Sequence, residues 1–495
     1  MSIGRRRWLA LYVLCLGSLM IVLDTTIVGV ALPSIRTDLG FSEASLAWVV
    51  NAYLLTFGGF LLLGGRLGDL FGHRRLFVGG ITLFTLASVG CGLASSRSLL
   101  IGARAVQGLG GAVVEAVALS LMINLFTGPA ERAKAMGVYG FVASGGGSLG
   151  VLLGGVLTNS LDWHWIFLVN VPIGILVFAL ALRLVPSGRS EPASRRLDVA
   201  GALTVTASVM LAVYAVVNGN QQGWTSRQTL GLVAAAAALL VGFLVIEARV
   251  GSPLVPLGLF RLRNLATANL VSVLWAAAMF AWFFLTALYL QLVLGYSPLQ
   301  VGLAFLPGNL IMGAFSVGLS ARLVTRLGVT LPLVTGLLLA TAGLALLARA
   351  PVSGSFAVDV LPSMILLGVG AGMALNPVLL AAISDVAPEE SGLASGMVNT
   401  SFMLGGALGL AVLASLAASR TDHLLASGQA RLTALAGGYH VAFLVAAAFS
   451  AAAAALGALL LTASDESAEL GAEAASVPAC SGPGRSVPLL ERRAA

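Results

Sequence analysis

Long apolar stretches fill this sequence and constrain its fold more than any other feature. Fourteen of them follow one another, and about 20 apolar residues are enough to span the hydrocarbon core of a bilayer. Charged residues make up only 9% of the chain, whereas a soluble protein carries about 25%. The chain therefore cannot cover a soluble surface, and it is predicted to be an all-α polytopic membrane protein with fourteen transmembrane helices. The stretches fall near residues 8–32, 46–65, 76–94, 99–126, 135–158, 165–185, 198–217, 228–247, 265–290, 299–320, 329–348, 359–383, 393–417 and 439–462.

The placement of basic residues predicts which side of the membrane each loop faces. If the N-terminus is cytoplasmic, 20 of the 27 Lys and Arg residues lie on the cytoplasmic side, six lie outside and Arg104 lies within a stretch. Basic residues concentrate in cytoplasmic loops, so both termini are expected in the cytoplasm. The Arg-rich composition suggests a bacterium, so the expected location is a bacterial inner membrane. Arg5 to Arg7 and the apolar run after them resemble a secretory signal, but a run that reaches about Leu32 is too long for one.

Charge and cysteine usage exclude several other classes of protein. The formal net charge of +7 is explained by these loops, so no nucleic-acid partner is expected. Three cysteines and four histidines are scattered without metal-ligand spacing. Because no catalytic constellation or nucleotide-binding module is present, we expect no enzyme, no metal and no cofactor. Transport would then draw on an ion gradient, with a small-molecule substrate, a proton and the lipid bilayer as partners.

Two short basic turns suggest that the chain is internally duplicated. Residues 65–72 follow the second stretch and residues 321–328 follow the tenth, on the same predicted side. Duplicated halves are typical of secondary transporters, in which the substrate site lies between them. We therefore predict two six-helix halves, an inserted pair of helices and a disordered tail. Their bounds are 8–185, 198–247, 265–462 and 463–495, respectively.

Three ionisable residues lie deep within apolar stretches, where a charge is costly and marks a candidate functional site. Asp24 is expected to bind a proton or a cationic substrate, or else to be the satisfied partner of an arginine or of backbone groups. Arg104 cannot deprotonate, so it is expected to hold carbonyls or an acid, unless it only reaches toward the outer surface. Glu115 lies eleven residues later on the same helical face and is the second candidate carboxylate.

Four further acidic residues lie at the predicted ends of stretches. Charged side chains at such ends usually reach solvent or the interface, so solvated positions are expected for them. They are Asp198, Glu247, Asp359 and Asp385.

Glycine recurs every four residues in the fifth stretch, at Gly146, Gly150 and Gly154, with Gly155 adjacent. No lysine follows in the pattern of a phosphate-binding loop. Small residues at this spacing give a smooth face for close packing between membrane helices. We predict such packing, and a face of this kind can also slide between conformations.

Aromatic and amide residues supply candidates for the lining of a cavity. Trp275 and Trp282 fall on one helical face, where they could form a wall for an apolar or cationic substrate or pack between helices. The other candidates are Thr25, Asn51, Asn376 and Asn399, any of which could instead serve only to hydrogen-bond one helix to another.

Several motifs resemble those of the major facilitator superfamily, specifically its fourteen-helix drug:proton antiporter branch, over about residues 8–462. Residues 65–75 resemble the superfamily signature between helices 2 and 3. Residues 23–33, 48–53, 104–111, 163–172, 295–298 and 405–409 resemble motifs of the branch. The resemblance implies the major facilitator fold, with two six-helix halves plus two inserted helices.

The resemblance also implies roles for individual residues. It implies that Gly65, Asp69, Gly72, Arg74 and Arg75 form a cytoplasmic latch that stabilises one conformation. It further implies that Arg104 takes part in proton coupling.

The sequence departs from the branch at several positions, including His164, which stands where an arginine is usual. Val151 stands where a proline usually follows the helix-5 glycine, and Phe402–Met403 replace a common Arg-Gln pair. Glu115 stands where an apolar residue is expected, so it is a candidate for tuning substrate charge or proton stoichiometry.

Together these features predict a secondary active exporter that moves amphipathic drug-like compounds outward by proton-coupled antiport. One alternative is a dedicated exporter of a single natural product, siderophore or metabolite. An alternative of a different class is a non-transporting membrane sensor or scaffold. A periplasmic adaptor protein is a further candidate partner of an exporter.

Overall fold

The computed structural model describes residues 3–126, 129–186, 198–251, 253–387 and 390–461, apart from a few side chains within helices. The described residues form a helical bundle. Its elements are α1 (Ile3–Leu39), α2 (Glu43–Leu46), α3 (Trp48–Phe71), α4 (His73–Gly92), α5 (Arg97–Leu125), α6 (Pro129–Ser160), α7 (Trp165–Leu168), α8 (Asn170–Leu184), α9 (Val199–Gln222), α10 (Arg227–Arg249), η1 (Leu257–Arg261), α11 (Arg263–Leu288), η2 (Tyr289–Val293), α12 (Pro298–Ala314), η3 (Phe315–Leu319), α13 (Ser320–Leu327), α14 (Thr330–Leu347), η4 (Phe356–Val360), α15 (Leu361–Ile383), α16 (Ser391–Ala426) and α17 (Arg431–Leu460).

A helix covers each of the fourteen predicted apolar stretches. Among the described residues, twelve helices are long and apolar enough to cross a membrane. Two stretches are covered by helices outside that set: α6, which is 32 residues long, and α12, which has 17 residues and continues into the π-helical turn η3. The fold is thus that of an all-α polytopic membrane protein.

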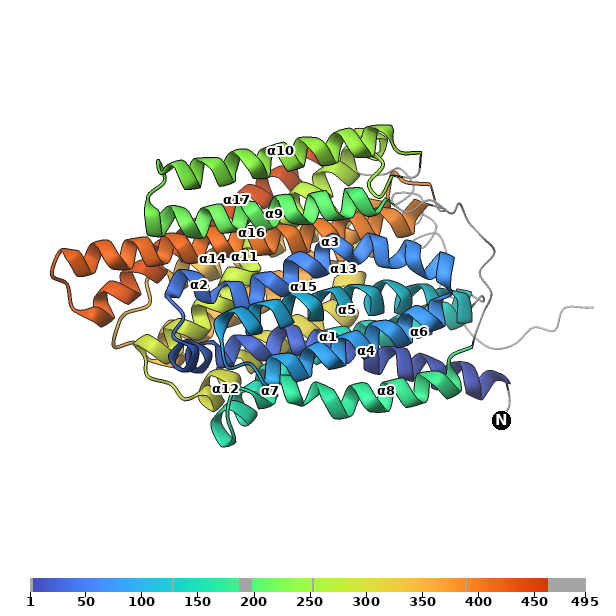
Figure 1. Ribbon diagram of the computed structural model, residues 1–495, viewed down its shortest axis with the longest axis horizontal. Coiled ribbons are helices and arrows are strands. Elements are labelled where there is room, and N and C mark those ends of the chain that lie inside the picture. The colour runs from blue at the N-terminus through green and yellow to red at the C-terminus, as the bar shows by residue number, and fades with distance from the viewer. Residues whose placement is uncertain (1–2, 127–128, 187–197, 252, 388–389, 462–495) are drawn as a thin grey trace, which may run out of the picture.

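The long helices lie side by side along one axis of the bundle (Figure 1). The pair α9 and α10 lies at one edge, and α8 lies at the opposite edge. Helix α9 packs against α10, α3 and α16, whereas α6 packs against both α1 and α12. Segments far apart in the sequence therefore meet in the middle of the bundle.

The two predicted basic turns are mostly helical. Helix α3 continues through the first motif to Phe71, and α13 occupies most of the second. Each helix ends at a glycine with positive φ, Gly72 at +92° and Gly328 at +75°. Glycine adopts this backbone conformation without a Cβ penalty. The corresponding positions of the two motifs therefore share the same way of ending a helix.

The glycine face of α6 lies directly against neighbouring backbones. A Cβ at Gly150 would lie 2.1 Å from Thr26 Oγ1 and 2.7 Å from the Leu23 carbonyl oxygen, and one at Gly154 would lie 2.6 Å from the Ile27 carbonyl oxygen. On the other side of α6, a Cβ at Gly155 would lie 2.7 Å from the Pro298 carbonyl oxygen of α12. Helix α6 thus joins α1 to α12 through contacts that only glycine allows.

Alanine substitution on α6 tests this packing. Gly150→Ala forces the new methyl group against α1 and should destabilise the protein by about 1–3 kcal/mol. Gly147→Ala is the matched control, because its Cβ would meet only Thr26 Cγ2 at 3.9 Å. This substitution should also gain about 1 kcal/mol from the higher helix propensity of alanine. Thermal unfolding of the purified proteins in detergent measures both effects. Equal melting temperatures would contradict the packing described here.

Candidate functional site: a buried ion pair between α1 and α5

Asp24 on α1 and Arg104 on α5 form an ion pair in the interior of the bundle. Arg104 Nη1 lies 2.6 Å from Asp24 Oδ2. Asp24 is 0% exposed and Arg104 is 1% exposed, so neither side chain reaches the surface of the protein. The alternative in which Arg104 only reaches toward the outer surface is wrong, because its guanidinium group is buried in the bundle and meets an acid.

Two amides complete the surroundings of the Asp24 carboxylate. Gln107 Nε2 donates to Asp24 Oδ1 at 2.7 Å, and Asn170 Nδ2 of α8 donates to the same oxygen at 2.8 Å. An ionised carboxylate only accepts hydrogen bonds, and with Arg104 it here has three donors. The arrangement therefore fits Asp24 in its ionised form.

Arg104 has further partners that hold its guanidinium group in place. Nε donates to the Val49 carbonyl oxygen of α3 at 2.9 Å, and Nη1 also donates to Gln107 Oε1 at 2.7 Å. The guanidinium carbon lies 4.4 Å from the ring centroid of Tyr53 and 5.7 Å from that of Phe167. At these distances the cation–π interaction stabilises the guanidinium group in a desolvated site. Helices α1, α3, α5 and α8 thus all contribute to the ion-pair site.

Glu115 on α5 forms a separate polar contact. Tyr139 of α6 donates to Glu115 Oε1, while Oε2 is buried and has no hydrogen-bond partner. The structure therefore does not join Glu115 to the Asp24 carboxylate. Tyr53 lies between the two groups: its ring covers Arg104, and its hydroxyl lies 3.0 Å from where a Cβ of Gly111, one turn before Glu115, would be.

The predicted latch residues lie at the junction of α3 and α4. Arg74 donates to the Leu182 carbonyl oxygen of α8, and Arg75 is exposed. Gly65 has open space around it, and Gly72 forms the turn. The side chain of Asp69 lies outside the part that the structure describes.

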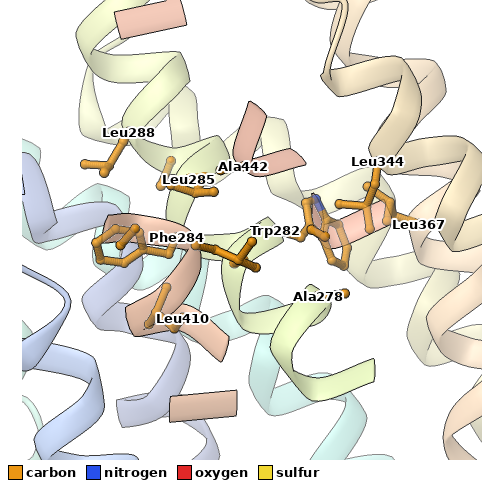
Figure 2. Close-up of a cluster of buried hydrophobic side chains, with 14 of the residues drawn as sticks. Ala278, Trp282, Phe284, Leu285, Leu288, Leu344, Leu367, Leu410 and Ala442 are labelled. Atoms are coloured by element: carbon orange, nitrogen blue, oxygen red, sulfur yellow. The ribbon is translucent and has the colours of Figure 1, made fainter. Parts of the chain in front are cut away.

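The two tryptophans proposed as a cavity wall lie in the packed core. Trp275 is 1% exposed and Trp282 is 0% exposed, and both belong to the same hydrophobic cluster as Leu344 and Leu367. Figure 2 shows the Trp282 indole beside these two leucines. Both indoles thus pack between helices in this conformation, and their Nε1 atoms have no hydrogen-bond partner.

The remaining polar candidates have different surroundings. Asn51 is 0% exposed, and neither of its amide atoms has a hydrogen-bond partner. Thr25 donates to the Ile21 carbonyl oxygen at 2.9 Å, and Asn376 donates to that of Ser316 at 2.8 Å. Asn399 is exposed. Asn51 thus has free hydrogen-bonding capacity inside the bundle, as do the buried Nε1 atoms of Trp275 and Trp282.

Sequence reasoning missed the amide residues around Asp24. Gln107 follows Arg104 by three residues, so both lie on one face of α5, and this spacing could have singled it out. Asn170 lies 146 positions from Asp24, and no periodicity within either helix links them. Ser88 on α4, which accepts from Gln107 at 2.8 Å, was missed for the same reason.

Comparisons with known proteins agree with this architecture. The model of the family described as the Major Facilitator Superfamily matches residues 14–410. The chain is 41% identical over 460 residues to a puromycin resistance protein of Streptomyces alboniger, covering 92% of this chain and 90% of that protein. It is 40% identical to a cephamycin export protein of Amycolatopsis lactamdurans, covering 83% of this chain and 85% of that protein.

A solved structure shares the fold. The crystal structure of a bacterial homologue of the human lysosomal transporter Spinster, inward-facing and unoccupied, superimposes with a TM-score of 0.64 at 18% identity. The match covers 93% of this chain and 98% of that one.

The helical bundle and these relatives define a multi-pass membrane transporter rather than an enzyme. The chain belongs to the Major Facilitator Superfamily.

A double-mutant cycle tests the coupling between Asp24 and Arg104. Arg104→Met leaves a buried carboxylate without its countercharge and should cost about 3–5 kcal/mol of stability. Combining it with Asp24→Asn removes both charges and should recover much of that loss. Thermal unfolding of the two single variants and the double variant gives the coupling. Arg97→Met, at an exposed arginine that donates to the Leu39 carbonyl oxygen, is the control. Strictly additive losses would argue against an ion pair.

Proposed function

We propose that this protein is a secondary active exporter, in which a proton moving inward drives an amphipathic drug-like molecule outward. The observation that carries the proposal is the buried Asp24–Arg104 pair in a member of a transporter superfamily. A charged group within a membrane is costly and is retained at proton and substrate pathways. The relatives named for puromycin resistance and cephamycin export support a drug-like substrate.

The proposed topology has fourteen spans, formed by the twelve long apolar helices together with α6 and α12. Residues 8–185 and 265–462 form the two six-helix halves, 198–247 the inserted pair and 463–495 a cytoplasmic tail. The matching helix ends at Gly72 and Gly328 support the duplication. The excess of basic residues on one side supports cytoplasmic termini, and the relatives from Streptomyces and Amycolatopsis support a bacterial inner membrane.

The proposed coupling step is a competition between a proton and Arg104 for the Asp24 carboxylate. Protonation of Asp24 removes the negative charge and with it the Coulomb attraction to the guanidinium group. Arg104 keeps its charge and can still hold the Val49 carbonyl oxygen and Gln107. Release of the proton re-forms the pair. Because each state favours a different arrangement of α1, α3, α5 and α8, the proton biases a two-state equilibrium of the transporter.

The latch residues supply a second bias in this proposal. Asp69, Arg74 and Arg75 would form ion pairs and hydrogen bonds at the cytoplasmic junction in one conformation and release them in the other. The bond from Arg74 to the Leu182 carbonyl oxygen supports a latch that ties α4 to α8.

A narrower substrate range is the second candidate function. Each of the two relatives is named for a single antibiotic, which favours a dedicated exporter of one natural product. A sensor or scaffold that does not transport is the candidate of another class. That function would not require the buried ion pair, in which three hydrogen-bond donors surround the carboxylate. A periplasmic adaptor remains a proposed partner of the exporter.

Transport in inverted membrane vesicles tests proton coupling. With an imposed proton gradient and a panel of cationic, neutral and acidic compounds, the wild-type protein should accumulate at least one class. An uncoupler should abolish that accumulation. Asp24→Asn should reduce the accumulation to the background seen with the uncoupler, because an amide does not bind and release a proton at physiological pH.

Asp422→Asn is the control for this experiment, because Asp422 is exposed on α16 and far in sequence from the ion pair. Accumulation that survives the uncoupler would rule out proton coupling. Coupled transport by Asp24→Asn at the wild-type rate would move the proton to another carboxylate. A protein that transports no compound of the panel would favour the sensor or scaffold.

Glu115→Gln tests whether the carboxylate on α5 selects substrate charge. Removing a negative charge from a partly buried site should weaken the apparent affinity for cationic compounds about tenfold and leave neutral compounds unaffected. Competition between compounds in the same vesicles measures this, with Tyr139→Phe as the variant that removes only the hydrogen bond to Glu115. Equal losses for cationic and neutral compounds would contradict a role in charge selection.

A further inference from the structure

Two acidic residues, at the start of α9 and near the end of α10, are buried. The sequence predicted solvated positions for both. Asp198 is 4% exposed and Glu247 is 3% exposed. Asp198 is the N-cap of α9, and its Oδ1 accepts from the Gly201 backbone N–H at 2.7 Å. Glu247 lies near the end of α10, and its Oε2 accepts from the Val255 backbone N–H at 3.1 Å. One oxygen of each carboxyl group is thus satisfied by the backbone.

The other two oxygens face each other across Gly201. Asp198 Oδ2 and Glu247 Oε1 are buried and have no donor among the described residues. A Cβ at Gly201 would lie 2.4 Å from the first and 2.9 Å from the second, so both oxygens lie against the same position on this glycine. Glycine at this position therefore leaves the space that both carboxyl oxygens border.

The described surroundings of the two acids supply no countercharge. The part of α3 that packs here contributes Phe60, Leu62, Leu63 and Leu67, and the connection after α10 contributes Leu254 and Val255. Helix α9 has no charged residue, and the first charge of α16 is Arg420. Arg249 on α10 is exposed. The other charged residues near this site in the sequence, Arg66, Asp69, Arg195 and Arg196, have side chains outside the described part.

We propose that Asp198 and Glu247 together bind one proton, so that a carboxylic acid–carboxylate hydrogen bond joins the start of α9 to the end of α10. The proton comes from the adjoining aqueous side and returns to it, and no other bond changes. Two carboxylates this close cannot both ionise without strong repulsion. One shared proton supplies the missing donor and removes that repulsion.

The donor set fits a proton better than a metal ion. Only two free oxygens meet here, whereas Ca²⁺ takes six to eight oxygen ligands and Mg²⁺ about six. No group of three or more metal-ligating side chains occurs among the residues that the structure describes.

The shared proton would tie three segments together. Asp198 holds the start of α9, Glu247 holds the end of α10, and the bond to Val255 holds the connection toward α11. Leu254 and Ala202 then pack on Leu63 of α3. Loss of the proton leaves two buried negative charges face to face, so the inserted pair should come away from α3 as the pH rises.

Two measurements on the purified full-length protein in lipid nanodiscs test this site without any transport assay, so the outcome is independent of the proposed antiport. The infrared spectrum of the wild-type protein should contain a carbonyl band of a protonated carboxylic acid that is absent from both Glu247→Gln and Asp198→Asn. As the pH rises from about 6 to about 9, the melting temperature of the wild type should decrease more steeply than that of Glu247→Gln. The glutamine amide can donate a hydrogen bond to the Asp198 carboxylate at every pH. Asp198→Asn should be equally flat, since asparagine also caps a helix. Asp422→Asn is the control and should keep the wild-type dependence.

Three outcomes would overturn the proposal. The first is the same pH dependence in the wild type and in both amide variants. The second is an infrared acid band that persists in both variants. The third is an increase in melting temperature with Mg²⁺, Ca²⁺ or Na⁺ that only the wild type displays, which would make the site a cation site. If one variant fails to fold, the infrared comparison with the other still decides.

Discussion

The structure depends most on the cost of placing charge inside a bundle of apolar helices. The Asp24 carboxylate and the Arg104 guanidinium group are fully buried, and each would be strongly destabilising alone. They are tolerated because Arg104 contacts Asp24 Oδ2 directly and because Gln107 and Asn170 donate hydrogen bonds to Asp24 Oδ1. Since these donors come from different helices, the positions of α1, α5 and α8 are tied to one electrostatic requirement. A change in the charge of Asp24 therefore alters the interactions that hold all three helices in place.

Close packing of backbones supplies the frame in which this pair is held. Gly150 and Gly154 bring α6 against α1, the helix that carries Asp24, and Gly155 brings α6 against α12. In a bilayer no hydrophobic force drives helices together, so van der Waals contact at small residues contributes much of their association. A glycine face without bulky side chains also permits one helix to slide on another. The ion pair and this glycine face are thus parts of the same contact between α1 and its neighbours.

Sequence reasoning anticipated the features that depend on local composition. The fourteen apolar stretches all coincide with helices, because apolar length alone favours a helix whose backbone groups are satisfied internally. Asp24 and Arg104 stood out because charge is rare in such stretches. Gln107 and Asn170 did not, because the apolar stretches hold several amides and only the fold determines which of them face Asp24. Trp275 and Trp282 were ambiguous because their spacing fits equally a core and a cavity wall, and only packing separates the two.

The sequence by itself determined the class of protein, the position of its helices and the buried charges worth testing. Hydropathy and charge scarcity act locally, so they can be read without knowing which helices touch. The tertiary structure decided which partners those charges have: Arg104 for Asp24 and Tyr139 for Glu115. It also brought Glu247 next to Asp198, although 48 residues lie between them in the sequence. Burial of Asp198 and Glu247 also could not be inferred from their positions at helix ends. An end is solvated only when no other segment covers it, and here α3 together with Leu254 and Val255 covers this end.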